Sequence, residues 1–190
     1  MAAAVNAAIP PRKKSPAKAA PAKAAPAGRR GAARLAAVQA LYQLDINGGK
    51  PDAVIQEFVD HRLGRELDGD VYGGADETLF RAIVAGAATK REELDNMIAA
   101  VLPEAWPLDR LETILREILR CGVYELAELP EIPGPVVISE YVGVADAFYQ
   151  GKEPGMVNAV LDRLARELRA TEAPRQDAKR NAGGGEPPAA

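Results

Sequence analysis

The stretch RRGAARLAAVQALYQLD, residues 29–45, combines a basic start with an apolar helical pattern. Leu35, Val38 and Tyr42 recur at i, i+3 and i+7, and Ala37, Leu41 and Leu44 trace a neighbouring stripe, which is typical of an amphipathic α-helix. Such a helix needs its apolar residues, but it does not need three arginines in front of them. The basic start leaves two interpretations open, a solubilised helix end or a surface that holds a polyanion.

The helical period continues through most of the remaining chain, and strand alternation is not evident elsewhere. We expect further helices in five segments, at residues 51–63, 75–102, 107–126, 134–150 and 153–170. The Val-rich PVVIS at 135–139 is compatible with a strand, although Tyr141, Val144 and Phe148 continue its apolar face at helical spacing. Glycine pairs and prolines separate the segments. The pattern therefore predicts an all-α bundle of six or seven helices.

The net charge of −3 hides a strong asymmetry along the chain. Residues 1–34 contain eight of the 24 basic groups and no acidic group, so the remainder has 16 basic groups against 27 acidic ones. Binding to nucleic acid depends on where basic groups lie more than on their sum. An acidic pI of about 5.4 is therefore no argument against a polyanionic partner.

Composition predicts three parts. Residues 1–28 form an Ala/Pro/Lys-rich basic tail whose prolines and low apolar content predict disorder, residues 29–170 form the folded domain, and residues 171–190 form a second disordered tail. Neither a membrane-spanning run nor a secretory signal is evident, so we expect a cytoplasmic protein without membrane contact. The N-terminus resembles a transit peptide only loosely.

Enzyme chemistry finds little support in the residue types present. His61 is the only histidine, and its position beside Arg62, away from the apolar face, favours solvent exposure over catalysis. Cys121 is the only cysteine, which excludes an internal disulfide, and its neighbour Gly122 favours a close helix contact over a nucleophile. No phosphate-binding loop or metal-ligand set has the required spacing. We expect no enzyme, no cofactor and no metal.

The basic start of the first helix is a better candidate for function. Arg30 and Arg34 are four residues apart, so both can project from one side of a helix, and Arg29 adjoins them. Arginine forks match phosphate oxygens, and single-stranded RNA commonly stacks its bases on aromatic rings. Tyr42 lies two turns further on and is either such a ring or a core residue. Spacing alone leaves RNA binding and an ordinary soluble helix both open.

Four stretches together resemble the NusB family of transcription antitermination factors. The opening RRGAARLAAVQALYQLD is similar to the first helix of that family, with its arginine-rich start and AVQALY core. LFRAIVAGAATKREELDNMIAAVL is similar to its long third helix, and WPLDRLETILREILRCGVYEL to the segment that follows. VVISEYVGVADAFYQGKEPGMVNAVLDRLARE is similar to the end of the family's sequence, and its closing MVNAVLDRLARE is the most specific piece. The resemblance covers residues 29–168.

The resemblance implies two small helical subdomains packed side by side and a non-enzymatic role. It implies binding to the boxA element of ribosomal RNA leader transcripts together with NusE, a small-ribosomal-subunit protein, in a complex with RNA polymerase that suppresses premature termination. By matched position it assigns seven residues to RNA binding: Arg29, Arg30, Arg34, Tyr42, Arg116, Arg120 and Lys152. Asn158 is expected to be structural and to satisfy backbone groups of an adjacent loop.

Two alternatives remain. Some ribosomal RNA cytosine methyltransferases have a NusB-like domain ahead of a catalytic one, although we expect no α/β cofactor domain in residues 171–190. A purely structural module that self-associates as a homodimer is the other. The basic tail is expected to supplement RNA affinity without sequence preference.

Overall fold

The computed structural model describes residues 28–63, 66–67, 70–71 and 74–170. It contains seven α-helices, which confirms the all-α prediction: α1 Arg29–Asn47, α2 Pro51–His61, α3 Glu77–Thr89, α4 Arg91–Val101, α5 Thr113–Glu128, α6 Gly134–Phe148 and α7 Glu153–Leu168. A 3-10 turn, η1 (Leu108–Arg110), precedes α5, and a hairpin of two-residue strands, β1 (Glu66–Leu67) and β2 (Asp70–Val71), follows α2. The two predicted tails lie outside the described residues, except for Gly28.

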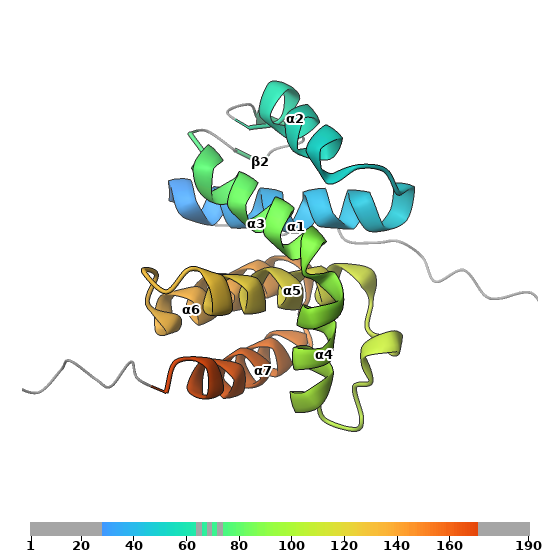
Figure 1. The fold of residues 1–190 in the computed structure, drawn as a ribbon, viewed down its shortest axis with the longest axis vertical. Coiled ribbons are helices and arrows are strands. Elements are labelled where there is room, and N and C mark those ends of the chain that lie inside the picture. Colours follow the sequence, from blue (N-terminus) through green and yellow to red (C-terminus); the bar gives the residue numbers. More distant parts are fainter. Residues whose placement is uncertain (1–27, 64–65, 68–69, 72–73, 171–190) are drawn as a thin grey trace, which may run out of the picture.

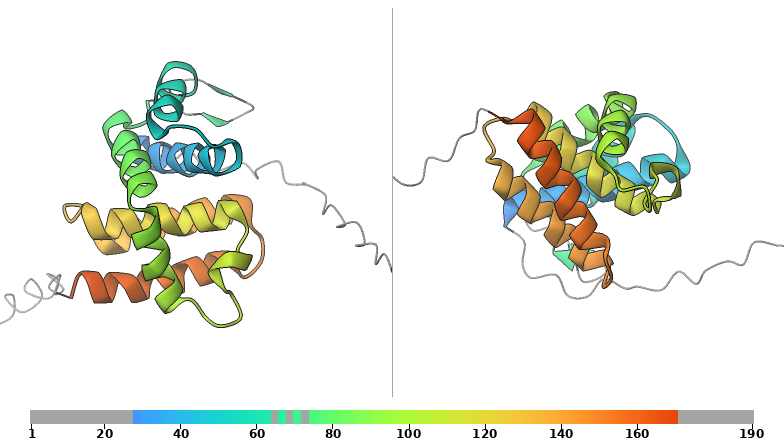
Figure 2. Two further views of the ribbon diagram at one scale, coloured as in Figure 1. Left: turned by 45° about the vertical axis from the view of Figure 1, so that its right-hand side comes forward. Right: turned by 90° about the horizontal axis from the view of Figure 1, so that it is seen from below.

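The helices form two groups that lie side by side. Helices α1, α2 and α3 make one group, and α4, α5, α6 and α7 make the other (Figure 1). The left view of Figure 2 shows the same division, with α1 next to α5 at the boundary. This arrangement confirms the two side-by-side subdomains that the family resemblance implies.

Helix α5 lies at the centre of the bundle. It packs against α1, α3, α4, α6 and α7. Ile118, Leu119 and Cys121 are fully buried on it, and one continuous apolar core joins the two subdomains through these side chains. Burial raises the pKa of the Cys121 thiol well above its ordinary value, so this side chain is a small core residue, as the sequence favours. Because so many helices cover α5, even some of its charged side chains are buried.

The C-terminal end of α5 is closed by a side chain from the far end of the chain. The last carbonyl groups of a helix have no partner within it. The guanidinium of Arg169 donates to the carbonyl oxygens of Leu126 at 2.7 Å and of Glu125 and Leu129 at 3.0 Å, and also to that of Ile132. This contact fixes the connection from α5 to α6.

The run at 75–102 that the sequence presents as one periodic segment is two helices. The break lies at Lys90 (φ −97°, ψ 20°), which ends α3 and precedes α4. One turn before the break, Gly86 of α3 lies so close to the ring of Tyr124 of α5 that a Cβ at Gly86 would be 2.0 Å from the ring. The change of axis directs α3 toward α1 and α4 toward α5 and α7. Both helices bury an apolar face, so the periodicity continues across the break and does not reveal it.

The Val-rich 135–139 is helical. Pro135 occupies the first turn of α6, where a missing N–H costs little. Val137 is fully buried and Val136 is exposed. Because Tyr141 and Val144 are also buried, the buried positions follow a helical and not a strand-like spacing.

The end of α1 is set by Gly48 at φ +69°, a conformation that favours glycine. No helix among the described residues is long and apolar enough to span a membrane.

Candidate nucleic-acid interface

Arg29 and Arg30 lie at the start of α1 and are exposed. Arg29 Nε donates to the carbonyl oxygen of Gly74 at 2.6 Å, and its own carbonyl accepts from the Asp76 N–H at 2.9 Å, so the loop before α3 is held against this helix start. Arg30 Nε lies 3.8 Å from the Asp76 carboxylate, and the Arg30 side chain is 61% exposed. We call Arg29 and Arg30 the entrance cluster. Its guanidinium groups retain N–H donors that face solvent.

Arg34 lies in the interior, with 1% of its side chain exposed. Its Nε donates to the two carboxylate oxygens of Glu125 at 3.1 and 3.0 Å, and a terminal nitrogen bonds the same carboxylate. The other terminal nitrogen lies 3.2 Å from Glu140, and the Tyr141 hydroxyl donates to Glu125 at 3.0 Å. Burial opposes the charge, but the hydrogen bond and the charge of Glu125 outweigh it and raise the pKa of Arg34. The structure therefore buries Arg34, which the resemblance assigns to RNA, and makes it the link between α1, α5 and α6.

Arg120 is also buried, with 4% of its side chain exposed. Its Nε and one terminal nitrogen each donate to Asp95 of α4 at 2.7 Å, and the other terminal nitrogen donates to Glu117. The guanidinium holds α4 against α5. Like Arg34, it is buried and bonded to carboxylates, so neither residue is one of the exposed basic residues of this surface.

Arg116 and Tyr42 lie toward the opposite end of α1. A terminal nitrogen of Arg116 donates to Asp45 at 3.3 Å, and 21% of the Arg116 side chain is exposed. Tyr42 is 41% exposed and lies one turn before Asp45, so the two share one side of the helix. Tyr42 is therefore a surface residue, and not the core residue of the alternative interpretation.

Lys152 immediately precedes α7 and is exposed. The segment before it is tied to the start of α5, because the Tyr149 hydroxyl donates to Glu112 at 3.2 Å. Lys152 therefore lies at the same end of α5 as Arg116. We call Tyr42, Arg116 and Lys152 the far-end cluster.

The two clusters are well separated. Helices α1 and α5 run antiparallel, since Arg34 pairs with Glu125 and Asp45 pairs with Arg116. Sixteen residues separate Arg29 from Asp45, and at a rise of 1.5 Å per residue this is about 24 Å. The seven residues that the resemblance assigns to RNA thus fall into two surface clusters and two buried side chains.

Arg91 is a surface arginine that the sequence did not single out as a binding residue. It begins α4, its side chain is 45% exposed, and it bonds the same Asp45 carboxylate as Arg116. Its contact with α1 depends on the break at Lys90, which the periodic pattern conceals.

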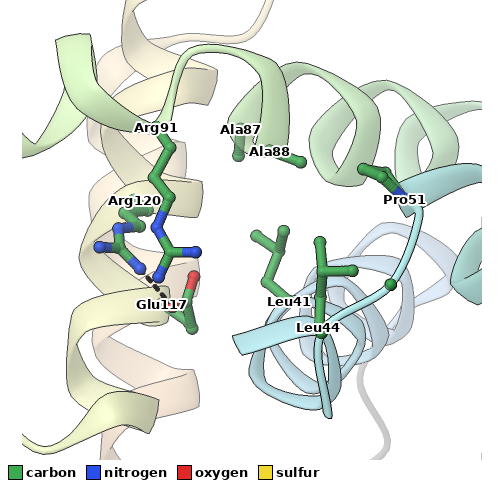
Figure 3. Close-up of a pocket in the computed structure, with 10 residues that line it drawn as sticks. Leu41, Leu44, Pro51, Ala87, Ala88, Arg91, Glu117 and Arg120 are labelled. Atoms are coloured by element: carbon green, nitrogen blue, oxygen red, sulfur yellow. Dashed lines mark hydrogen bonds and ion pairs between the residues drawn. The ribbon is translucent and has the colours of Figure 1, made fainter. Parts of the chain in front are cut away.

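Arg91 also lines a pocket between the two subdomains. The pocket has a volume of about 300 Å³ and is shown in Figure 3. Its lining comes from α1, the turn after it and the start of α2, from α3, and from α4 and α5: Leu41, Leu44, Gly48, Gly49, Pro51, Ala87, Ala88, Arg91, Glu117 and Arg120. One side is apolar and the other is charged. We call it the inter-subdomain pocket.

Other expectations on single residues have mixed outcomes. His61 is exposed, as its position favours. Asn158 is exposed on α7 and receives no hydrogen bond among the described residues, so the expected structural role is wrong. Its apolar sequence neighbours face the core on the other side of the helix, and those neighbours suggested burial. Groups of acidic, histidine and cysteine side chains that suit a metal ion are absent from the described part of the chain.

The comparison with known proteins decides the family. The model of the NusB family matches residues 31–166. The chain belongs to the NusB family. It is 50% identical over 139 residues to the transcription antitermination protein NusB of Sinorhizobium medicae, covering 73% of this chain and 87% of the relative. It is 51% identical over 142 residues to that of Bradyrhizobium diazoefficiens, covering 75% and 86%.

Solved structures of the family share this fold. NusB of T. maritima matches with a TM-score of 0.59 and 27% identity, over 74% of this chain and 92% of that one. A chain from a crystal structure of the antitermination factors NusB and NusE in complex with dsRNA matches with a TM-score of 0.61 and 27% identity, over 73% and 97%. In that second structure, NusB is seen in complex with NusE and with dsRNA.

Proposed function

We propose that this protein is a non-enzymatic transcription antitermination factor that binds the boxA element of ribosomal RNA leader transcripts together with NusE. In that complex it acts on RNA polymerase to suppress premature termination. The observation that supports RNA binding most directly is the entrance cluster, two solvent-facing arginines at the start of α1 in a member of the NusB family. The solved complex of NusB and NusE with dsRNA supports the same partners.

The proposed RNA surface has two parts. Arg29 and Arg30 at one end of α1 offer paired guanidinium donors beside the helix N-terminus, where backbone N–H groups and the helix dipole also favour a phosphate. Arg116 and Lys152 at the other end of α1 offer further positive charge, and the Tyr42 ring lies one turn before Asp45, which Arg116 bonds. A single strand that follows α1 can contact both parts. The basic residues 1–27, outside the described residues, are proposed to add affinity without sequence preference.

Electrophoretic mobility shifts test this function. The full chain is titrated into a labelled boxA oligonucleotide, a scrambled single strand of the same composition, and a duplex, each with and without NusE. We expect boxA binding at least tenfold tighter than to the scrambled strand, and tighter still with NusE. Equal binding to boxA and scrambled RNA in the presence of NusE would refute the proposal.

A further inference from the structure

The inter-subdomain pocket belongs to neither of the two surface clusters proposed above for RNA. The residues that line it indicate the kind of ligand that it can bind. We propose that it binds one unstacked base of the RNA, with the sugar-phosphate backbone passing over Arg91. This inference rests on the proposed RNA binding and names a site for it. It concerns residues that lie outside both surface clusters.

The dimensions and walls of the pocket suit a flat, apolar face. A volume of about 300 Å³ is at the lower end of the range of small-molecule sites, which is enough for one heterocyclic base. Leu41 and Leu44 of α1 lie opposite Ala87 and Ala88 of α3, and Pro51 closes one edge (Figure 3). Proteins that hold an extruded base commonly place it between such apolar side chains. The walls therefore provide the contact that would replace stacking in the RNA.

The charged end of the pocket offers an acceptor next to donors. The side chain of Glu117 is only 3% exposed, and its carboxylate accepts a hydrogen bond from Arg120 on Oε1. Among the described residues, Oε2 receives no hydrogen bond. Because Glu117 lines the pocket and this oxygen is not fully buried, a ligand N–H that enters the pocket can donate to it. Arg91 lies beside it with N–H groups beyond the one that bonds Asp45 (Figure 3).

This combination selects against simple ions. A phosphate or carboxylate would meet the Glu117 carboxylate, and an ammonium group would meet the guanidinium groups of Arg91 and Arg120. A neutral group with a donor next to an acceptor can satisfy both, and the edges of the nucleobases have that arrangement. Carboxylates are known acceptors for the amino group of cytosine, and arginine is a known donor to ring acceptors. The polar end therefore fits the hydrogen-bonding edge of a base.

The rim of the pocket connects it to the far-end cluster. Asp45 receives hydrogen bonds from both Arg91 and Arg116, and 14% of its side chain is exposed. The Asp45 carboxylate thus holds the two guanidinium groups next to each other, and Arg91 also lines the pocket. A phosphate that approaches this rim can exchange with the Asp45 carboxylate on either arginine. A strand on the far-end cluster would accordingly pass over the pocket opening.

The test combines a pocket-filling variant with an abasic scan of the RNA. Ala88→Leu places a larger side chain in the pocket without altering a charge. Ala100→Leu makes the same change on an exposed position of α4 and is the matched control. Each protein, with NusE present, is titrated with the boxA oligonucleotide and with copies that lack one base at a time. Thermal unfolding of both variants shows that they fold.

In wild type, one abasic position should lower affinity about tenfold more than its neighbours do, as expected for one base contact. Ala88→Leu should lower affinity for intact RNA about tenfold and remove the difference at that position, whereas Ala100→Leu should leave both unchanged. An unchanged abasic profile in Ala88→Leu, or a flat profile in wild type, overturns the base site while the proposed boxA binding stands. If Ala88→Leu instead weakens binding to NusE without RNA, a protein side chain occupies the pocket. If wild type prefers no RNA, both proposals fail.

Discussion

Arg30 and Arg34 are one helical turn apart on α1, yet their environments are opposite. The side chain of Arg30 is 61% exposed and 3.8 Å from one carboxylate, whereas that of Arg34 is 1% exposed and bonded to Glu125 and Glu140. The cause is the extent of the covering helix. Helix α5 runs antiparallel to α1 and ends at Glu128, one turn beyond Glu125, so Arg34 is covered and Arg30 extends past the cover. One helical turn thus separates a buried arginine that links three helices from an exposed arginine that we propose to bind RNA.

The largest effect that tests this difference is on stability. Arg34→Met removes the cation and leaves Glu125 buried beside Tyr141, and breaking one side of a buried ion pair typically costs about 3–5 kcal/mol. We expect the free energy of unfolding in urea to fall by that amount. Arg163→Met is the control, because Arg163 on α7 is 61% exposed and its pair with Glu167 is a surface pair. It should change stability by less than about 0.5 kcal/mol.

A double variant separates the lost pair from lost packing. Arg34→Met combined with Glu125→Gln removes both charges but keeps an acceptor for the Tyr141 hydroxyl. It should recover part of the loss seen in Arg34→Met. If the free energy of unfolding of Arg34→Met falls by less than about 1 kcal/mol, the Glu125 carboxylate reaches water. Arg34 then does not link α1 to α5 and α6 through a buried ion pair.

The bundle itself could be predicted from the sequence, because apolar residues at helical spacing must be buried on one face. Helix α1 and the helical character of 134–148 follow from that spacing. The break at Lys90 could not be predicted, since both α3 and α4 continue the same period. The hairpin formed by β1 and β2 is too short to produce an alternating pattern.

The site could be predicted only in part, because sequence spacing places a side chain on a helix face without stating what covers that face. One signal for Arg34 was present. It extends the stripe of Ala37, Leu41 and Leu44 by one turn, so a cation stands where that stripe predicts burial. A charge on an apolar stripe indicates a buried pair. The partner, Glu125, is 91 residues away, and only the tertiary fold identifies it.

The second prediction compares buried charges on α5. Burial raises the pKa of Glu117, and the nearby charges of Arg120 and Arg91 only partly oppose it. A carboxyl group whose pKa is higher in the folded state favours folding while it is protonated, and that contribution is lost as the pH rises through its folded pKa. Glu117→Gln has no such titration. We therefore expect the stability of wild type relative to Glu117→Gln to fall as the pH rises from about 4 to 7.

Urea unfolding of both proteins at several pH values measures that difference, and groups common to both cancel. The sign is the test, because an ordinary surface glutamate paired with arginine has a lowered pKa and gives the opposite trend. A flat difference would show that Arg120 fully offsets the burial of Glu117.

The smallest effect on stability is expected at Arg30, and there the function is expected to change instead. Arg30→Ala removes an exposed guanidinium, so the free energy of unfolding should change by less than about 0.5 kcal/mol. If Arg30 contacts a phosphate of single-stranded RNA, fewer counterions are released on binding. The slope of log affinity against log salt should then flatten by about 0.7. The side chain of Arg163 is 61% exposed, as is that of Arg30, so Arg163→Ala is the matched control. It should leave the slope unchanged, because Arg163 belongs to neither the entrance cluster nor the far-end cluster. An equal change in the two variants would mean that the slope reports total charge. The proposal that Arg30 binds RNA whereas Arg34 is structural would then be wrong for Arg30.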